Sequence, residues 1–483
     1  MKYILDQRYR LRGWHGSPYG LYDTKTGEVL FLPEAFYHIL MLCDAVQETD
    51  AEFLSPEERS FLLNLQEEKI IQPAGRWDFL TEKQRYHAYP ARYRKNAHWS
   101  LTGACNMRCR HCFMSAPHKK HGVPELKELL NIAEQLAECG VFSVGLTGGE
   151  PMMREDFGEI VEALSAREIR ITEIYTNGWL VNEALLKMLE RNGQRPSFQL
   201  SYDGMGMHDY LRGIPGAEER VTEALKLLNQ RKYRTSVSMC LHRKNKDTLK
   251  DTVSFLADLG VTALKCSSIM ELGEWTNAET EKLRLSRQEE LEIYEQYIPQ
   301  YFAENAPLSL ELSGAFLYER GMNRWRSFYH RECLKEQEAK MPACSSLLMA
   351  FYIGPDGTVA PCQGMCDCNF AKIFPNLKEK PLREILTDSK YVSLSHATVR
   401  DVRNGNEDCR RCEYRDRCTG GCRNAALVHG DNYFGPDYDA CWFFKNGWEE
   451  RIKNAAQPSF EAYRNRCPEA FVHLKEEDPF RCV

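Results

Sequence analysis

Three closely spaced cysteines near residue 105 are the first residues in this chain that can do chemistry. Cys105, Cys109 and Cys112 are separated by three and then by two residues. A loop of this length can wrap one corner of a four-iron, four-sulfur cube and bind three of its irons through thiolates. The fourth iron is left without a protein ligand, so a small chelating molecule can bind it. A zinc site is the alternative, because zinc also accepts thiolates.

A glycine-rich turn and several polar residues follow at the ends of the next predicted strands. The sequence Thr-Gly-Gly-Glu-Pro occupies residues 147–151, directly after an apolar run. Glycines let a backbone approach a ligand closely, and carbonyl oxygens and the Glu150 carboxylate can accept hydrogen bonds from an ammonium group. Asn177, Ser201 and Arg212 stand at or after later strand ends. Asn-Gly and Asp-Gly pairs in this region are also ordinary turn sequences, so the signal lies in the order of these residues.

In this combination the sequence resembles the radical S-adenosylmethionine superfamily, whose three cysteines have this spacing and an aromatic residue before the last. His111 fills the aromatic position. The resemblance implies that S-adenosylmethionine chelates the open iron, and that an electron from the cluster cleaves it to a 5′-deoxyadenosyl radical. It also implies that residues 147–151 bind the amino group, that Ser201 and Arg212 bind the carboxylate, and that Asn177 lies near the ribose. The implied cofactor-binding residues are His111, Gly148, Gly149, Glu150, Pro151, Asn177, Ser201 and Arg212.

The C-terminal third contains a second and longer cysteine pattern. Ten of the 19 cysteines lie between residues 333 and 441, and in a reducing cytosol such groups bind metal or do redox chemistry more often than they form disulfides. Cys344, Gly357 and Cys362 are followed by Cys-x2-Cys-x5-Cys-x3-Cys over residues 409–422 and by Cys441. This resembles the seven-cysteine pattern of the SPASM domain, found on radical enzymes that modify peptides and proteins. A zinc ribbon is the structural alternative.

The SPASM resemblance implies two auxiliary [4Fe-4S] clusters, and so three clusters in the whole chain. It assigns one set of ligands as Cys344, Cys362 and Cys422, and the other as Cys409, Cys412, Cys418 and Cys441. The first set lacks a fourth ligand, which leaves open Cys333, Cys366, Cys368, substrate or solvent. Outside the pattern, Cys467 and Cys482 receive no role. Four single cysteines in apolar surroundings are predicted to be core residues: Cys43, Cys139, Cys240 and Cys266.

Length and composition predict a cytoplasmic enzyme of two or three domains. The chain has 483 residues, which exceeds the size at which a single core stops growing. The formal net charge of -6 gives no general attraction to nucleic acid or to an anionic membrane. No apolar run is long enough to span a bilayer, and residues 1–20 lack the apolar core of a signal peptide.

Alternating strand and helix patterns from residue 98 onward must position the motifs. Strands are predicted at 99–104, 142–147, 173–177, 198–203, 236–242 and 263–269, with helical patterns such as 126–139 between them. Six strands that are each followed by a helix predict an α/β fold, a partial (βα)6 barrel with chemistry at the C-terminal ends of its strands. We therefore expect a radical core over residues 93–309 and a SPASM domain over 310–483.

The first 92 residues are expected to form a separate front domain with a bridge to the barrel. A strand at 2–11, a hairpin at 19–32, and helices beginning near Pro33 and Ser55 make a winged-helix-like pattern. The pattern resembles the peptide-recognition domain of enzymes that modify ribosomally made peptides. The following residues, 76–95, mix basic and aromatic side chains. They could steer an acidic peptide, or form a linker whose aromatic residues pack between domains.

Together these resemblances imply a maturase of ribosomally synthesised peptides. Its partners would be a precursor peptide with a leader sequence and an electron donor such as flavodoxin or ferredoxin. Hydrogen abstraction would lead to a thioether, which we favour slightly because an open auxiliary iron could hold a substrate thiolate, or to a carbon–carbon bond. The remaining alternatives are a sulfatase-maturing enzyme, a peptide epimerase using Cys240 or Cys266 as hydrogen donor, and a non-catalytic metal-binding protein. The catalytic base is not identified by any motif.

Overall fold

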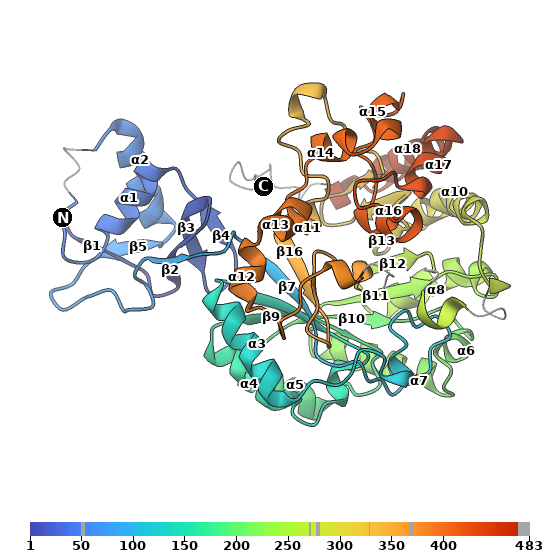
Figure 1. Cartoon of the computed structure of the whole chain (residues 1–483), viewed down its shortest axis with the longest axis horizontal. Coiled ribbons are helices and arrows are strands. Elements are labelled where there is room, and N and C mark those ends of the chain that lie inside the picture. The colour runs from blue at the N-terminus through green and yellow to red at the C-terminus, as the bar shows by residue number, and fades with distance from the viewer. Residues whose placement is uncertain (50–53, 270–271, 277–280, 328, 367–370, 472–483) are drawn as a thin grey trace.

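The computed structural model describes residues 1–483 except 50–53, 270–271, 277–280, 328, 367–370 and 472–483. Cys368 and Cys482 therefore lie outside the described residues. Figure 1 shows a small front domain beside a larger body that contains the main sheet and its helices. Within the described residues, no helix is both long and apolar enough to cross a membrane.

All six predicted strands of the body are present and run parallel to one another. They are β7 (Asn96–Ser100), β8 (Ser143–Thr147), β9 (Arg170–Thr176), β10 (Ser197–Ser201), β11 (Thr235–Cys240) and β12 (Ala263–Ser267). Several predicted ranges ran too far at their C-terminal ends, because residues such as 101–104 and 202–203 leave the sheet to form site loops. The strand ends are therefore at the positions that the motifs require.

A helix follows each strand and covers one face of the sheet. These helices are α3 (Leu126–Glu138), α4 (Phe157–Ala166), α5 (Glu183–Arg191), α7 (Ala217–Gln230), α8 (Leu249–Asp258) and α10 (Arg287–Ala303), with the short α6 (His208–Arg212) before α7. Alternation along the strands places Leu200, Val237 and Leu264 in the core against these helices, each at most 1% exposed. The opposite face, with Ser201 and Ser238, is only partly buried. This is the predicted partial barrel.

The sheet continues past the boundary expected at residue 309 and has eleven strands in all. Beyond β12 it adds β13 (Ser309–Leu312) in parallel, and then β14 (Phe316–Glu319) and β15 (Arg324–Arg326) in antiparallel. At the other edge β16 (Ala350–Ile353) pairs in parallel with β7, and β17 (Val359–Ala360) follows it. The cysteine-rich region is thus joined to both edges of the barrel sheet.

Short helices carry most of the cysteine-rich region. They are α11 (Ser345–Met349), α12 (Leu382–Thr387), α13 (Ser389–Ser395), α14 (Val399–Asn404), α15 (Glu407–Arg411), α16 (Arg423–Gly430) and α17 (Tyr438–Lys445). The longer α18 (Trp448–Arg466) lies against α10, where the guanidinium of Arg451 donates to Glu295 at 3.0 Å. Short helices connected by loops can bring cysteines from distant positions together, since the backbone changes direction often.

The front domain has its own hydrophobic core and the predicted order of elements. Its elements are β1 (Tyr3–Leu5), β2 (Tyr9–Trp14), β3 (Ser17–Asp23), β4 (Val29–Phe31), α1 (Glu34–Leu42), α2 (Pro56–Glu67), β5 (Ile71–Pro73) and β6 (His87–Tyr89). The single strand predicted at 2–11 is instead two strands, because the chain turns at Asp6, whose carboxylate accepts from the Arg8 amide. The helix predicted at Ser55 begins there with the expected capping box.

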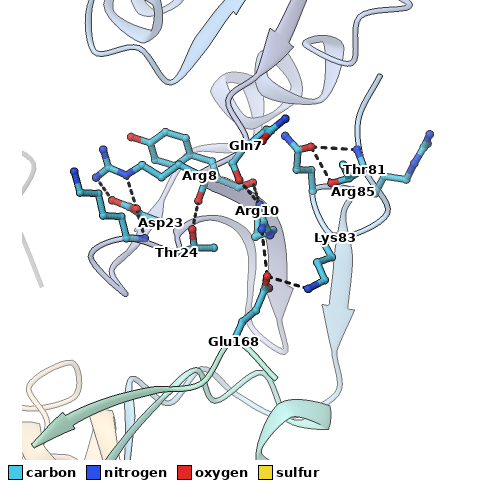
Figure 2. A network of polar contacts seen from close by, with 12 residues as sticks. Gln7, Arg8, Arg10, Asp23, Thr24, Thr81, Lys83, Arg85 and Glu168 are labelled. Carbon is cyan, nitrogen blue, oxygen red and sulfur yellow. Dashed lines mark hydrogen bonds and ion pairs between the residues drawn. The ribbon is translucent and has the colours of Figure 1, made fainter. Parts of the chain in front are cut away.

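The front domain is fixed to the N-terminal ends of the barrel strands, opposite the ends that carry the motifs. The indole of Trp14 donates to the carbonyl of Gly140, at 3.2 Å, just before β8. Glu168, just before β9, accepts from Arg10 at 3.3 Å and from Lys83 at 3.1 Å (Figure 2). The ammonium of Lys95, just before β7, pairs with Glu28 at 2.9 Å. Because β9 has seven residues at about 3.3 Å each, this interface lies roughly 20 Å from the motif ends.

Candidate active site and metal centres

The cysteine loop after β7 gathers three free thiols, each with a hydrogen-bond donor. The amide of Met107 lies 3.4 Å from the Cys105 sulfur, and the amide of Ala116 lies 3.3 Å from the Cys112 sulfur. Burial raises the pKa of Cys105 to about 12 and that of Cys112 to about 11, and the neighbouring Cys109 thiol contributes to both shifts. Thiols so close together ionise readily only when a metal binds them. This arrangement fits a thiolate-bound cluster.

Glycines allow neighbouring segments to approach this loop closely. A side-chain carbon on Gly149 would lie 2.1 Å from the carbonyl oxygen of Ala104, and one on Gly213 would lie 2.3 Å from that of Arg108. Gly213 also has a φ of +70°, in the region that favours glycine. The loop is therefore held between the residue 147–151 turn and the end of α6. Gly148 and Pro151 belong to the same turn, and Pro151 is buried.

Glu150 is fully buried at the ends of β8 and β9. Its carboxylate accepts from the Thr176 hydroxyl at 3.0 Å and from the backbone amide of Asn177 at 2.9 Å. Burial raises the pKa of Glu150 to about 7, although these hydrogen bonds oppose the shift. A cation bound beside Glu150 would restore its charge, which suits an ammonium group. The side-chain amide of Asn177 donates to the side-chain oxygen of Asn106, in the cysteine loop, at 2.7 Å, so Asn177 lies next to the cluster site.

Arg212 extends from α6 to the cysteine loop and is held by an acid that sequence reasoning missed. One guanidinium nitrogen lies 3.6 Å from the Cys109 sulfur, and another lies 2.7 Å from the Asp203 carboxylate. Burial alone would raise the pKa of Asp203, but Arg212 and His208 outweigh it and hold that pKa far below its usual range. Asp203 stands in an Asp-Gly pair for which an ordinary turn was the alternative interpretation, and the sequence assigned it no role of its own.

The Asp203 carboxylate and backbone also join β10 to the end of β11. The amide of Cys240 donates to the carboxylate at 3.0 Å, and Asn245 donates to the Asp203 carbonyl at 2.9 Å. Ligand atoms of His111, Asp203 and Cys240 all lie within 4.8 Å of one another. Cys240 is partly buried and packs against a small apolar cluster, but it also lies beside the site, so the prediction of a core residue holds only in part. Cys43, Cys139 and Cys266 are core residues as predicted.

His111 and Ser201, the remaining predicted cofactor residues, also lie at this end of the barrel. Burial lowers the pKa of His111 to about 3, so the imidazole is neutral at physiological pH. Its Nδ1 atom is buried without a hydrogen-bond partner among the described residues. Ser201 is the last residue of β10, two positions before Asp203. The structure therefore brings all eight predicted cofactor residues to one end of the sheet, and their contacts with S-adenosylmethionine stay a prediction.

Replacing Asp203 by Asn should weaken S-adenosylmethionine binding by about tenfold or more, because Arg212 would lose the carboxylate that orients it. Glu290→Gln is a matched control, since Glu290 is a buried acid paired with Arg287 at 2.8 Å. Each variant should lose about 3–5 kcal/mol of unfolding free energy. Calorimetric titration with S-adenosylmethionine and denaturant unfolding measure the two effects. Equal loss of cofactor affinity in both variants would reduce Asp203 to a stabilising role.

The seven patterned cysteines of the C-terminal region form two separate groups in the structure. Cys409, Cys412, Cys418 and Cys441 line one cavity of about 50 Å³. Burial raises the pKa of Cys418 to about 12, with Cys441 and Cys409 adding to the shift. The Asn406 amide group lies 3.2 Å from the Cys409 sulfur. Four thiols around one cavity fit a cluster with four protein ligands.

The other group contains Cys344, Cys362 and Cys422, which come from three separate segments. Burial of the sulfur raises the pKa of Cys422 to about 12, with further contributions from Cys362 and Cys344. Cys366 packs on the same small core as Cys344 and Cys362, whereas Cys333 is not part of that core. Of the two described candidates for a fourth ligand, the position of Cys366 is therefore the more suitable. The grouping matches the one that the resemblance implied, and metal ligation itself stays a prediction.

Comparison with known proteins gives the class to which this fold and site belong. The model described as "Radical SAM superfamily" matches residues 99–256, and the model described as "Iron-sulfur cluster-binding domain" (SPASM) matches residues 344–413. The chain therefore contains a domain of the radical S-adenosylmethionine superfamily. More particularly, this domain is combined with a SPASM domain, and the cofactors of the chain are S-adenosylmethionine and iron–sulfur clusters.

Several curated proteins are similar over most of their length. A PqqA peptide cyclase of Granulibacter bethesdensis is 25% identical over 68% of this chain and 82% of its own. An AdoMet-dependent heme synthase of Methanosarcina barkeri is 23% identical over 69% of this chain and 93% of its own. The antilisterial bacteriocin subtilosin biosynthesis protein AlbA of Bacillus subtilis is 24% identical over 77% of this chain and 78% of its own.

Among solved structures, Streptococcus suis SuiB bound to precursor peptide SuiA has a similar fold. Its TM-score is 0.60 at 16% identity, and the match covers 91% of this chain and 99% of SuiB. At this identity the likeness concerns the fold. It extends over the front domain, the barrel and the cysteine-rich region, because so little of either chain is left out.

Proposed function

We propose that this enzyme modifies a ribosomally made precursor peptide and installs an intramolecular thioether. The observation that carries the proposal is the front domain, which has its own core and is fixed to a radical S-adenosylmethionine and SPASM body. Sequence identity alone does not favour a peptide over another substrate, because a heme synthase matches about as well as a PqqA peptide cyclase. A separate domain beside the barrel is useful for a substrate long enough to reach both, and SuiB was solved with its precursor peptide.

The residues of this chain would divide the work at the barrel end. When bound, the first cluster and S-adenosylmethionine supply a radical that removes a hydrogen atom from a carbon of the peptide. Glu150 would hold the cofactor ammonium, and Arg212, oriented by Asp203, would hold its carboxylate. Thioether closure from C–H and S–H removes one hydrogen atom, one proton and one electron. The two further cysteine groups would hold clusters that supply an electron acceptor.

Thioether formation is favoured over carbon–carbon closure if Cys366 does not ligate the cluster of Cys344, Cys362 and Cys422, because that group then has only three protein ligands. An iron left open there could hold the thiolate of a substrate cysteine. Carbon–carbon closure is the second candidate, because it has the same electron balance. A low-potential donor such as flavodoxin or ferredoxin would supply the electron that starts each turnover, and we propose a cytoplasmic location for the reaction.

The proposal is tested by anaerobic reconstitution with iron and sulfide, followed by S-adenosylmethionine, dithionite and synthetic peptides encoded by the short reading frames beside the gene. We expect 5′-deoxyadenosine together with a peptide that has lost a pair of hydrogen atoms and one free thiol. A product that keeps its thiol would favour the carbon–carbon bond. Cofactor cleavage with every such peptide left unmodified would contradict a peptide substrate.

Reconstituted protein should contain about twelve iron atoms per chain, from three four-iron cubes. The reason is that three separate thiol groups, one in the barrel and two in the C-terminal region, each fit one cluster. Iron and sulfide assays with elemental analysis measure the content. Saturation at one cube, with zinc making up the balance, would show that the C-terminal groups are structural zinc sites.

A further inference from the structure

The segment between β5 and β6 exposes two aromatic side chains to solvent. Trp77 is 81% exposed and Phe79 is 71% exposed. Large aromatic side chains are usually at least half buried in a folded protein, and exposed ones are frequent anchors of binding surfaces. No other part of the proposed function uses these two residues. Their exposure therefore requires a separate explanation.

The backbone at these two residues is ordered and anchored on both sides. The amide of Gly75 donates to the Asp78 carboxylate at 2.7 Å, and the Asp78 amide donates back to the Gly75 carbonyl at 3.3 Å. Leu80, the next apolar residue, is 7% exposed and belongs to the front-domain core. The turn at residues 75–78 thus holds the aromatic side chains outward, so a partner would bind them with little loss of chain entropy.

The base of the segment is attached to both the front domain and the barrel. Gln84 is 2% exposed, and its amide group donates to the carbonyl of Leu5 at 2.9 Å. Arg12 donates to the carbonyl of Lys83 at 2.7 Å. The Lys83 ammonium lies 3.1 Å from Glu168, just before β9 (Figure 2). A molecule held at residues 76–79 is therefore held in a defined position relative to the barrel.

One cation at the tip is available to an acidic side chain of a partner. The guanidinium of Arg76 lies over the Trp77 ring at 5.3 Å and pairs with no carboxylate among the described residues, whereas the Asp78 carboxylate of the same turn accepts from the Gly75 amide. Two other cations of the basic stretch are already paired: Lys83 with Glu168 and Lys95 with Glu28. Arg94 is buried against carbonyls of the cysteine-rich region. Arg76 is therefore the unpaired cation that lies beside the exposed aromatic rings.

We infer that Arg76, Trp77 and Phe79, here called the 76–79 surface, dock an acidic and apolar segment of the precursor peptide. The inference rests on the proposed function and names the place where the front domain holds the substrate. The aromatic rings bury apolar side chains of the segment, and Arg76 pairs with a carboxylate. The bound segment then lies at the end of the barrel opposite the cysteine loop, so the modified residues must follow it at a distance.

The test measures binding of a fluorescently labelled precursor peptide, from a reading frame beside the gene, to the full-length reconstituted enzyme by anisotropy. Trp77→Ala with Phe79→Ala should raise the dissociation constant at least about tenfold, because two aromatic anchors are lost. Arg76→Glu should weaken binding and reverse its decrease with salt. Peptide-independent formation of 5′-deoxyadenosine should stay unchanged, since the cofactor site lies at the other end of the barrel.

A matched control removes two other exposed apolar side chains of the same domain, with Val46→Ala and Leu63→Ala, which are 66% and 58% exposed. This variant should bind the peptide normally. Normal binding by the Trp77 and Phe79 variant, together with weakened binding by the Val46 and Leu63 variant, would place the peptide elsewhere on the front domain. That result would overturn the inference and leave the proposed function intact. Conversion of a dimer to a monomer by the aromatic variant, with unchanged peptide affinity, would show a self-association surface. Absence of peptide binding to the unaltered enzyme would instead contradict the proposed function.

Discussion

Replacing Cys105, Cys109 and Cys112 together by alanine is expected to abolish both 5′-deoxyadenosine formation and peptide modification. The Cys105 sulfur lies 3.8 Å from the Asn177 side-chain amide and the Cys109 sulfur lies 3.6 Å from the Arg212 guanidinium, so these thiols adjoin the residues suited to bind S-adenosylmethionine. Without them the barrel has no metal to bind the cofactor and no route for the reducing electron. The iron content should fall by about four atoms per chain. Chromatography of the anaerobic reaction and an iron assay check both results.

The matched control is Cys467→Ala, which removes a thiol that lies at the end of α18 and outside both cysteine patterns. It should keep the iron content and both activities. Retention of cofactor cleavage in the triple variant would show that another group in this chain reduces S-adenosylmethionine. The assignment of the barrel loop would then be wrong, whatever the role of the C-terminal cysteines.

Much of the fold follows from local sequence patterns, because each element carries its own signal. The helix predicted at 126–139 is α3 (Leu126–Glu138), whose apolar stripe includes Leu129, Ile132 and Leu136. The capping sequence at Ser55 starts α2 for the same reason. The six strands alternate with helices along the chain, so their parallel order was predictable from chain connectivity. The positions of the motifs at strand ends followed directly.

The pairings between distant segments had no such signal. β16 joins the sheet beside β7, although about 250 residues separate them in the sequence. Arg94 appeared only as one cation of a basic stretch, yet it is buried and donates to carbonyls of residues 347 and 348. For this part of residues 76–95 the linker interpretation was the correct one, as Tyr93 also packs against Trp14. Residues 76–79 are exposed, as are 81–83, 85–88, 90 and 95.

The cysteine groups show the same division between local and distant information. Cys409, Cys412 and Cys418 are close in sequence, so their common cavity could be expected from spacing alone. The inclusion of Cys441 and the separation of Cys422 came from family resemblance, and the structure places both thiols accordingly. Asp203 could not be recognised, because nothing in an Asp-Gly pair distinguishes a turn from a buried acid that orients Arg212. Its role depends on Arg212, which lies in α6, after Asp203 in the chain.

Replacing Cys409 and Cys412 by alanine is expected to separate cofactor cleavage from peptide modification. The two thiols line the cavity shared with Cys418 and Cys441, so their loss should remove that cluster and leave the barrel thiols in place. The folded variant should still release 5′-deoxyadenosine and yield little cross-linked peptide, because ring closure leaves an electron that needs an acceptor. Mass spectrometry of the peptide and quantification of 5′-deoxyadenosine give the ratio of the two products.

The interpretation requires that the variant stays folded, since metal binding and folding are coupled in cysteine-rich domains. Circular dichroism and gel filtration check this, and the Cys467→Ala protein again supplies the reference. The barrel should tolerate the change, because the region from α14 to α17 contains none of the strands of the main sheet among the described residues. If a folded variant shown to lack about four iron atoms cross-links the peptide fully, this cluster has a structural role. The electron would then leave through the group of Cys344, Cys362 and Cys422, whose removal becomes the decisive experiment.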